Sequence, residues 1–274
     1  MKVGIIGLGF VGGSMYKSFK LKDVDCVGYD SYKKIGTFEE VLNTNILFLC
    51  LPTLFDEERY MYNKDEIVKT LDKLVGFKSL IVIKSTVEPE STDILSKKYP
   101  KLKICHNPEF LTARTAFEDF HNQTHIVLGK GPNCYSIQEL YDFYHKYYPE
   151  AEINTCSSLE SESMKIFCNS FYASKIMLFN EYFLLCKKNG SNFEKIKSLM
   201  HKNKWINPMH TDIPGPDGSL GFGGACFPKD TKALNEYMKN LGSKNMILQS
   251  VIEECDVVRG NKIKIKNNNL LSFN

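Results

Sequence analysis

The first half of the chain alternates short apolar runs with stretches in which apolar residues recur at helical spacing. Several of the short runs are continuously apolar, which is typical of strands buried on both faces of a sheet. This alternation predicts an α/β fold built on a doubly wound, mainly parallel sheet. We expect strands over residues 2–6, 25–29, 45–51, 79–84, 103–106 and 124–128, a weaker edge strand over 151–155, and helices over 12–20, 64–74 and 137–148.

From residue 157 onward the pattern becomes helical. Ser157-Ser158-Leu159-Glu160 has the form of a capping box, and the apolar residues that follow keep a helical spacing to about Lys188. Residues 208–224 contain three prolines and five glycines and are expected to form a loop. We therefore expect a Rossmann-type domain over 1–156, a mainly helical central domain over 157–262, with helices at 192–202 and 230–238, and a basic, Asn-rich tail over 263–274.

Composition narrows the class of protein. The net charge of +3 over 274 residues gives no argument for a nucleic-acid or membrane-surface partner. The nine cysteines form no CxxC pair and have no histidine at metal-ligand spacing, so we expect neither a metal site nor a disulfide framework. The N-terminus is too short and too glycine-broken for a signal peptide, and no apolar stretch approaches the length of a membrane span. We expect a cytoplasmic protein.

A dinucleotide fingerprint lies at the start of the chain. Gly7-Leu8-Gly9-Phe10-Val11-Gly12 follows a predicted strand and opens a predicted helix, and Asp30 ends the next strand. In such a motif the glycines allow a tight turn, close approach of a pyrophosphate and close packing of helix on strand, while the acid binds ribose hydroxyls. Because an acid repels a 2′-phosphate, NAD is the expected cofactor. The expected cofactor contacts here are Gly7, Gly9, Phe10, Val11, Gly12, Asp30 and Lys33.

Two further features carry candidate chemistry. The segment Gly221 to Asp230 places Cys226 among glycines directly before a predicted helix, beside Lys229, where positive charge favours a thiolate. On the long helix, Lys165 and Asn169 are one turn apart, and together they suit the stabilisation of an oxyanion. Taken alone, Cys226 is equally well read as a small apolar residue, and the helix pair as a solvated lysine near a hydrogen-bonded asparagine.

The cysteine segment resembles the catalytic-cysteine signature of the UDP-glucose/GDP-mannose dehydrogenase family. Glu162 to Ile176, followed by Asn180-Glu181, is similar to the central helix of that family. Lys84 to Pro89 resembles its strand-end segment beside the nicotinamide, and Asn107 to Leu111 resembles its substrate loop. These motifs occur in the family's order, and the resemblance spans roughly residues 1–260.

The resemblance implies oxidation of the C6 alcohol of a nucleotide sugar to the carboxylate by two hydride transfers to NAD, through a thiohemiacetal and a thioester on the cysteine. The catalytic residues that it implies are Cys226, Lys165, Asn169, Asp230, Glu109 and Thr86. The implied substrate contacts are Glu109, Phe110, Leu111, Lys165, Asn169, Gly223 and Cys226. Further cofactor contacts are expected at Pro52, Thr53, Ser85 and Thr86. Without the resemblance, Asp230 is equally well interpreted as a helix N-cap, and Glu109 is interpreted as a surface acid after a proline.

Two of the departures from the family pattern bear directly on the expected site. Ala113 and Arg114 stand where the family has a second glutamate and a glycine, and we expect a short form without the family's third, nucleotide-binding domain. We therefore expect a homodimer in which the loop over 208–220 borders the substrate site of the partner, or a separate nucleotide-binding partner. Two alternatives stay open: a two-electron hydroxyacid-type dehydrogenase, which needs no thiol, and a non-catalytic NAD-binding or regulatory protein.

Overall fold

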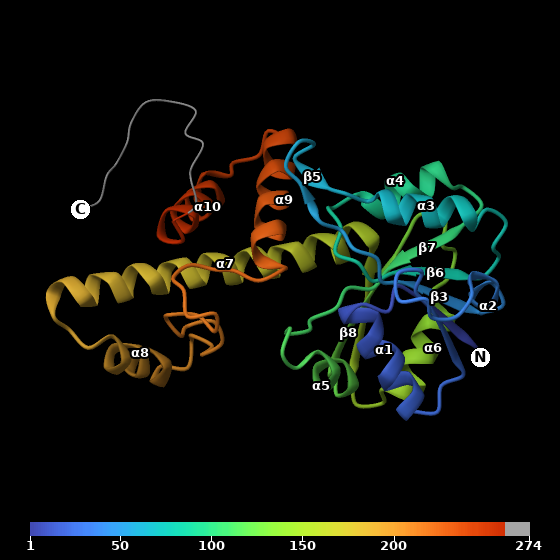
Figure 1. Ribbon diagram of the computed structural model, residues 1–274, viewed down its shortest axis with the longest axis horizontal. Coiled ribbons are helices and arrows are strands. Elements are labelled where there is room, and N and C mark those ends of the chain that lie inside the picture. Colours follow the sequence, from blue (N-terminus) through green and yellow to red (C-terminus); the bar gives the residue numbers. More distant parts are fainter. Residues whose placement is uncertain (261–274) are drawn as a thin grey trace. The chain divides into compact units, whose positions relative to one another are not determined.

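The computed structural model describes residues 1–260, and the chain divides into two compact units. The first unit spans residues 1–166, and the second begins at Phe167. The division falls within one long helix, α7 (Ser158–Asn189), which is continuous across it (Figure 1). The predicted boundary between residues 156 and 157 lies one residue before the start of this helix and ten residues before the division between the two units, and the predicted tail over 263–274 lies outside the described residues.

The first unit is built on a seven-stranded sheet with the order β2-β1-β3-β6-β7-β8-β9. All neighbouring strands run parallel except β7 and β8, which are antiparallel. The predicted α/β class and mainly parallel sheet are therefore confirmed, and the last strand lies at an edge as expected. The strands are β1 (Val3–Ile6), β2 (Cys26–Tyr29), β3 (Ile46–Leu49), β6 (Leu80–Ile83), β7 (Lys103–His106), β8 (His125–Lys130) and β9 (Glu152–Ser157).

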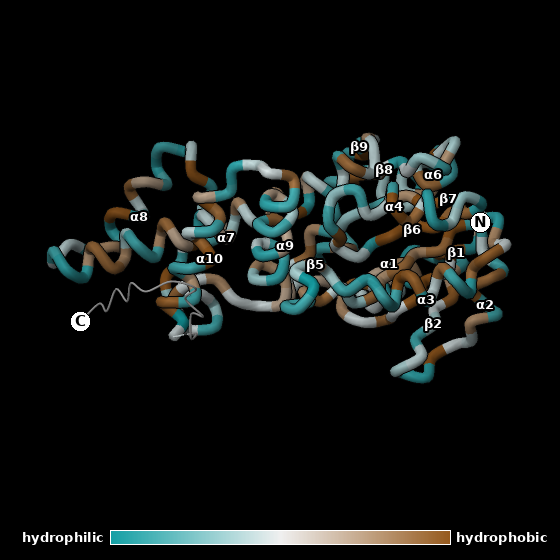
Figure 2. The backbone as a smooth tube through the Cα atoms, turned by 90° about the horizontal axis from the view of Figure 1, so that it is seen from above, coloured by the Kyte–Doolittle hydropathy of each residue, from teal (hydrophilic) through white to brown (hydrophobic). Residues whose placement is uncertain are grey.

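Helices cover both faces of this sheet, because the central strands are apolar on both faces. Side chains alternate along a strand, so Val3 and Ile5 of β1 belong to one core cluster and Ile6 to the other. The backbone coloured by hydropathy shows these central strands as apolar segments within the unit (Figure 2). One core includes residues of α1 (Phe10–Leu21), α5 (Ala116–His121) and α6 (Gln138–Tyr147); the other includes residues of α2 (Phe38–Leu42), α3 (Asp65–Lys73) and α4 (Ser91–Lys98).

The strand order reverses at β1, which lies between β2 and β3. In an open parallel sheet the crevice at the carboxyl ends of such strands is the usual ligand site. The turn after β1 and the residues after β3 meet there, which is where the glycine fingerprint falls. A small hairpin of β4 (Phe55–Asp56) and β5 (Met61–Tyr62) follows β3; we did not predict this hairpin, and its strands are too short to show an alternating pattern.

The second unit is helical in its described part. Besides the remainder of α7 it contains α8 (Phe193–Lys202), α9 (Phe227–Asn240) and α10 (Met246–Val258). The capping box at the start of α7 is present, since the Glu160 backbone N–H donates to Ser157 Oγ and the Glu160 carboxylate accepts from the Ser157 backbone. Residues 208–224 form turns without a helix or strand, as predicted. Of the helices described, none is long and apolar enough to cross a membrane.

Candidate functional site

The glycine turn between β1 and α1 has the geometry that close approach of a phosphate requires. Gly7 has φ +87°, and a Cβ on it would lie 2.4 Å from the carbonyl oxygen of Cys50. A Cβ on Gly12 would lie 2.0 Å from the carbonyl oxygen of Gly7, so only glycine lets the helix pack this closely on the turn. A Cβ on Gly9, in contrast, would meet nothing within 4 Å. The N-terminus of α1 therefore faces open space, which fits a pyrophosphate.

Asp30 lies at the carboxyl end of β2 and is tied to this turn. Its two carboxylate oxygens accept hydrogen bonds from the backbone N–H groups of Leu8, at 2.8 Å, and Lys33, at 2.9 Å. Burial opposes the charge, but these donors outweigh it and hold the pKa of Asp30 below its ordinary value. Lys33 Nζ donates to the carbonyl oxygen of Leu8 at 2.6 Å. The predicted ribose-binding acid is thus an ionised group that also holds the glycine turn in place.

The residues predicted to border the nicotinamide lie directly after β3 and β6, and several of them carry hydroxyl groups. Ser85 Oγ donates to the carbonyl oxygen of Leu51 at 2.6 Å, and Thr53 Oγ1 donates to that of Thr86 at 2.7 Å. These bonds join the segment that follows β3 to the segment that follows β6. Pro52, between Leu51 and Thr53 in the sequence, is exposed. The hydroxyls of Thr53 and Ser85 are therefore engaged in holding two loops together at the crevice.

Glu109 and Lys165 form a buried ion pair in the first unit. Lys165 Nζ lies 3.2 Å from Glu109 Oε1, and both side chains are less than one-tenth exposed. The other carboxylate oxygen of Glu109 accepts from the Leu111 backbone N–H at 2.6 Å, and Lys165 Nζ lies 5.6 Å from the centre of the Phe110 ring. The structure thus brings together four residues that the sequence assigned to substrate and catalysis, and Glu109 is not a surface acid.

Cys226 occupies the N-cap position of α9 and is exposed. Gly224, at φ +78°, makes the turn into this position, and Pro228 lies in the first turn, where a missing N–H costs nothing. Lys229 Nζ lies 2.5 Å from Asp230 Oδ1. Asp230 therefore compensates part of the charge of Lys229, and the N-terminus of α9 adds its own positive potential beside the thiol.

Asp230 is fully buried one turn after the cysteine. Its backbone N–H donates to the Cys226 carbonyl oxygen at 2.9 Å, and its Oδ2 accepts from Asn169 Nδ2 at 2.5 Å. Asp230 lies inside α9 and is not its N-cap, which corrects the alternative reading of this residue. The structure therefore joins three of the predicted catalytic residues in the second unit.

Sequence reasoning missed three buried polar residues of the first unit. Lys84 is 1% exposed, and burial lowers its pKa to about 8. Burial raises the pKa of Glu162 to about 7, and burial lowers that of His106 to about 3. Lys84 and Glu162 stood inside recognised motifs, but a lysine or glutamate in a sequence shows no sign of being buried. Only the packing around them reveals it.

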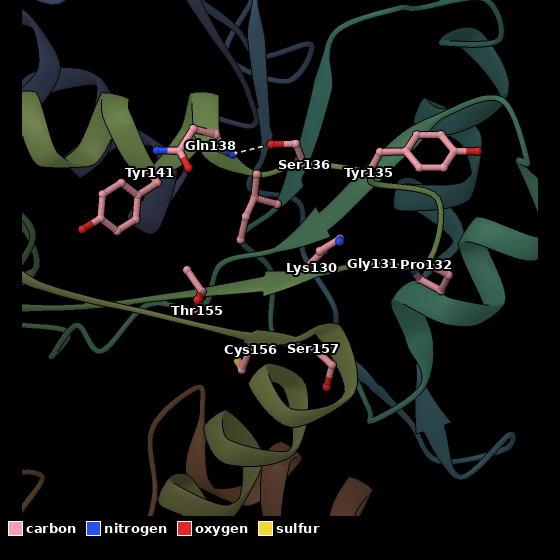
Figure 3. Close-up of a pocket in the computed structure, with 11 residues that line it drawn as sticks. Lys130, Gly131, Pro132, Tyr135, Ser136, Gln138, Tyr141, Thr155, Cys156 and Ser157 are labelled. Atoms are coloured by element: carbon pink, nitrogen blue, oxygen red, sulfur yellow. Dashed lines mark hydrogen bonds between the residues drawn. The ribbon is translucent and has the colours of Figure 1, made fainter.

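Each unit has a cavity in its described part, and one of the two lies at the cysteine segment. One of about 720 Å³ lies beside α6 and the edge strand β9, with Tyr135, Tyr141 and Cys156 in its wall, and none of its lining residues belongs to the predicted site (Figure 3). A smaller one of about 270 Å³ lies in the second unit and is lined by Gly223 and Pro228 of the cysteine segment and by Arg259. Among residues 1–260 no group of His, Cys, Asp and Glu side chains has the arrangement of a metal site.

Both parts of the chain match the models of one protein family. Residues 34–147 match the UDP-glucose/GDP-mannose dehydrogenase family, NAD binding domain, and residues 159–255 match the central domain of the same family. The UDP-glucose 6-dehydrogenase of Rickettsia bellii is 33% identical over 225 residues, which are 78% of this chain and 50% of that protein. UDP-glucose 6-dehydrogenase 1 of Glycine max is 32% identical over 168 residues, or 60% of this chain and 34% of that protein.

Solved structures agree at the level of the fold. A UDP-glucose dehydrogenase from Pyrobaculum islandicum superposes with a TM-score of 0.83 at 24% identity, covering 93% of this chain and 68% of that one. The 3-hydroxyisobutyrate dehydrogenase of Mycobacterium tuberculosis superposes with a TM-score of 0.74 at 15% identity, covering 95% and 94%. The chain spans about half the length of the Rickettsia relatives that it matches.

Proposed function

The chain belongs to the UDP-glucose/GDP-mannose dehydrogenase family, and on that premise we propose that it oxidises the C6 alcohol of a UDP-glucose-like nucleotide sugar to the carboxylate with NAD. The observation that carries the proposal is Cys226, an exposed thiol at the N-cap of α9 with the Asn169–Asp230 pair one turn behind it. A dehydrogenase that stops at an aldehyde or ketone has no use for such a thiol.

The proposed reaction has two oxidations joined by a covalent step. NAD, when bound, would accept one hydride in each oxidation, and in the first oxidation the hydroxyl proton of the C6 alcohol would pass to solvent. Between them, Cys226 Sγ adds as the thiolate to the aldehyde carbon, and the carbonyl oxygen becomes the alkoxide of a thiohemiacetal. The second oxidation leaves a thioester on Sγ. Water then adds to the thioester carbon, the C–S bond breaks, the thiolate is regenerated and the acid is released.

The other proposed residues stabilise the negative charge that develops on oxygen during the reaction, or take up and orient the hydrolytic water. Lys165, as an ammonium, and Asn169, through its amide, would stabilise negative oxygen in the alkoxide and in the tetrahedral intermediate. Glu109 is the proposed base that takes a proton from the hydrolytic water, and its contact with Lys165 holds its carboxylate in place. Thr86 and Asp230 are proposed to orient that water and the thiol-bearing turn.

The geometry of the glycine turn fits a dinucleotide, and it indicates which residues would contact each part of NAD. The backbone of the turn over 7–12 would hold the pyrophosphate, Asp30 would accept from ribose hydroxyls, and the segments after β3 and β6 would border the nicotinamide. Asp30 has both oxygens bound to backbone N–H groups, but each carboxylate oxygen can accept more than one hydrogen bond.

The test uses the purified chain with NAD and a panel of UDP-glucose, UDP-N-acetylmannosamine and GDP-mannose. NADH is followed by absorbance, and the products are identified by mass spectrometry. We expect two NADH for each sugar consumed and a carboxylate as the product. One NADH per turnover with a released aldehyde or ketone would favour a two-electron dehydrogenase, and NAD binding with no oxidation of any sugar would favour a non-catalytic protein.

A further inference from the structure

Lys84 is a buried lysine that the proposed reaction does not use. It follows β6 directly, continues the ladder through a backbone hydrogen bond to Leu49, and is 1% exposed. Its Nζ donates to the side-chain oxygen of Asn107 and to the carbonyl oxygen of Pro108, each at 3.0 Å. Burying an ammonium is costly, so a lysine persists in such a place only where its hydrogen bonds are well directed.

The two acceptors of Lys84 lie at the entry to the loop that carries Glu109. Asn107 is held on other sides as well: its Nδ2 donates to the carbonyl oxygen of Val127 at 2.8 Å, and its Oδ1 accepts from Tyr144 Oη at 2.6 Å. Pro108 has no N–H, and its carbonyl oxygen receives Lys84 Nζ. The lysine is thus the donor that fixes the peptide immediately before Glu109.

The charged neighbours of Lys84 give it a second effect on the same loop. Burial lowers its pKa to about 8; among its charged neighbours, Glu109 acts to raise it and Lys165 acts to lower it. Lys84 in turn acts to lower the pKa of His106. The Glu109 carboxylate therefore lies within the field of two lysines, one in direct contact and one behind the loop.

We propose that Lys84 is a positioning residue, which clamps the Asn107 side chain and the Pro108–Glu109 peptide so that Glu109 presents its carboxylate to Lys165. The inference rests on the proposed function for the role of Glu109, but the clamp itself is a property of the first unit. Removal of the clamp should loosen the loop over 107–111 and misplace Glu109, and the step that depends on Glu109 as base should slow while the binding of the sugar changes little. A misplacement of this kind lowers a rate by about 10²-fold.

The first arm of the test needs no turnover. Hydrogen–deuterium exchange of the full chain is compared for the unaltered protein and Lys84→Met, which keeps the unbranched aliphatic stem and removes the donors. We expect the amides of Glu109, Phe110 and Leu111 to exchange at least about tenfold faster in the variant. The matched control is Lys64→Met, which removes a lysine from the ion pair with Glu88 in the same unit and should leave these amides unchanged.

The second arm measures kcat and KM separately, with the cysteine adduct followed by intact-protein mass spectrometry. We expect Lys84→Met to lower kcat by about 10- to 100-fold, to lower KM with it so that kcat/KM changes by less than about threefold, and to accumulate the Cys226 thioester. Lys84→Gln, which keeps an uncharged NH2 donor group, should have a kcat between those of the unaltered protein and the methionine variant, and it replaces Lys84→Met in the test if that variant does not fold.

Exchange and kcat at the unaltered level in either Lys84 variant would overturn the clamp. If the unaltered protein oxidises no nucleotide sugar, the proposed function has failed, and the exchange arm alone then decides whether Lys84 holds the loop.

Discussion

Asn169 on α7 donates a hydrogen bond to the fully buried carboxylate of Asp230 on α9, with 2.5 Å between Nδ2 and Oδ2. Because Lys229 contacts the other oxygen of Asp230, the first turn of α9 is held in place from its inner side. The backbone that carries Cys226, at the N-cap of the same turn, is therefore held in a defined position. Such preorganisation is what a nucleophile at a helix end requires.

Replacing the nucleophile gives the first prediction. Cys226→Ser should abolish formation of the acid, by at least about 10³-fold, because a serine hydroxyl is a poor nucleophile at neutral pH and its ester is a poorer acyl donor. The carboxylate product is measured by mass spectrometry. Cys156→Ser, at the edge strand β9, is the control and should retain activity. Acid made by Cys226→Ser at near the unaltered rate would sink the covalent mechanism.

Variants of the buried pair of Lys165 and Glu109 should distinguish an effect on stability from an effect on catalysis. Lys165→Met and Glu109→Gln should each destabilise the protein, by about 3 kcal/mol, because each leaves one charge buried without its partner. The double variant should recover part of that stability but remain inactive. Urea unfolding and NADH formation check the two effects. Recovered activity in the double variant would contradict the proposed roles.

Asp30 should set the choice of cofactor. We expect the unaltered chain to bind NAD at least about tenfold more tightly than NADP, since the ionised Asp30 repels a 2′-phosphate. Asp30→Ala should narrow that gap and also weaken NAD binding, because it releases the Leu8 and Lys33 backbone from the turn. Fluorescence titration measures both affinities. Equal affinities in the unaltered chain would show that Lys33 dominates the pocket.

Glu162 should make stability depend on pH. Burial outweighs the hydrogen bonds from Thr92 and raises the pKa of Glu162 to about 7 in the folded protein. The protonated carboxyl therefore contributes stability that is complete below its unfolded pKa of about 4.3 and is lost as pH rises through about 7, on the order of 3 kcal/mol.

Glu162→Gln should consequently show a smaller fall in Tm between pH 5 and pH 8 than the unaltered protein. Calorimetry at both pH values is the measurement, and the exposed Glu150→Gln should keep the unaltered pH dependence. If the Tm of Glu162→Gln falls as steeply with pH as that of the unaltered chain, Glu162 is not the cause of the pH dependence.

Self-association is predicted through α7. Phe171, Leu178 and Leu185 recur at intervals of seven residues and are about half exposed or more, which is typical of a helix face that packs on another helix. Phe171→Lys should convert the expected homodimer to a monomer in sedimentation velocity. The control is Leu199→Lys on α8, a residue of similar exposure. An unaltered protein that sediments as a monomer would contradict the prediction.

Much of the fold was already predictable from the sequence. Buried strands such as Ile46–Leu49 are continuously apolar, and glycine, proline and capping residues mark the ends of elements, so the strands of the main sheet and six of the helices were predicted from local physics, whereas α4, α5 and α10 were not predicted. The glycine fingerprint and the cysteine segment are also local, because a tight turn or a helix start depends on neighbouring residues. The hairpin β4–β5 and the short helix α2 lack enough residues for a period to appear.

The tertiary structure decided which polar side chains meet. Lys84 and Asn107 are 23 residues apart in sequence, and Asn169 and Asp230 are 61 apart, so no local pattern relates them. Burial and partners determine the charge state of a lysine or a carboxyl, and both come from elements brought together by packing. The sequence by itself therefore determined the elements and the candidate chemistry. Only the folded chain decided that Glu109 is ion-paired, that Asp230 lies within α9, and that Lys84 is buried behind the loop.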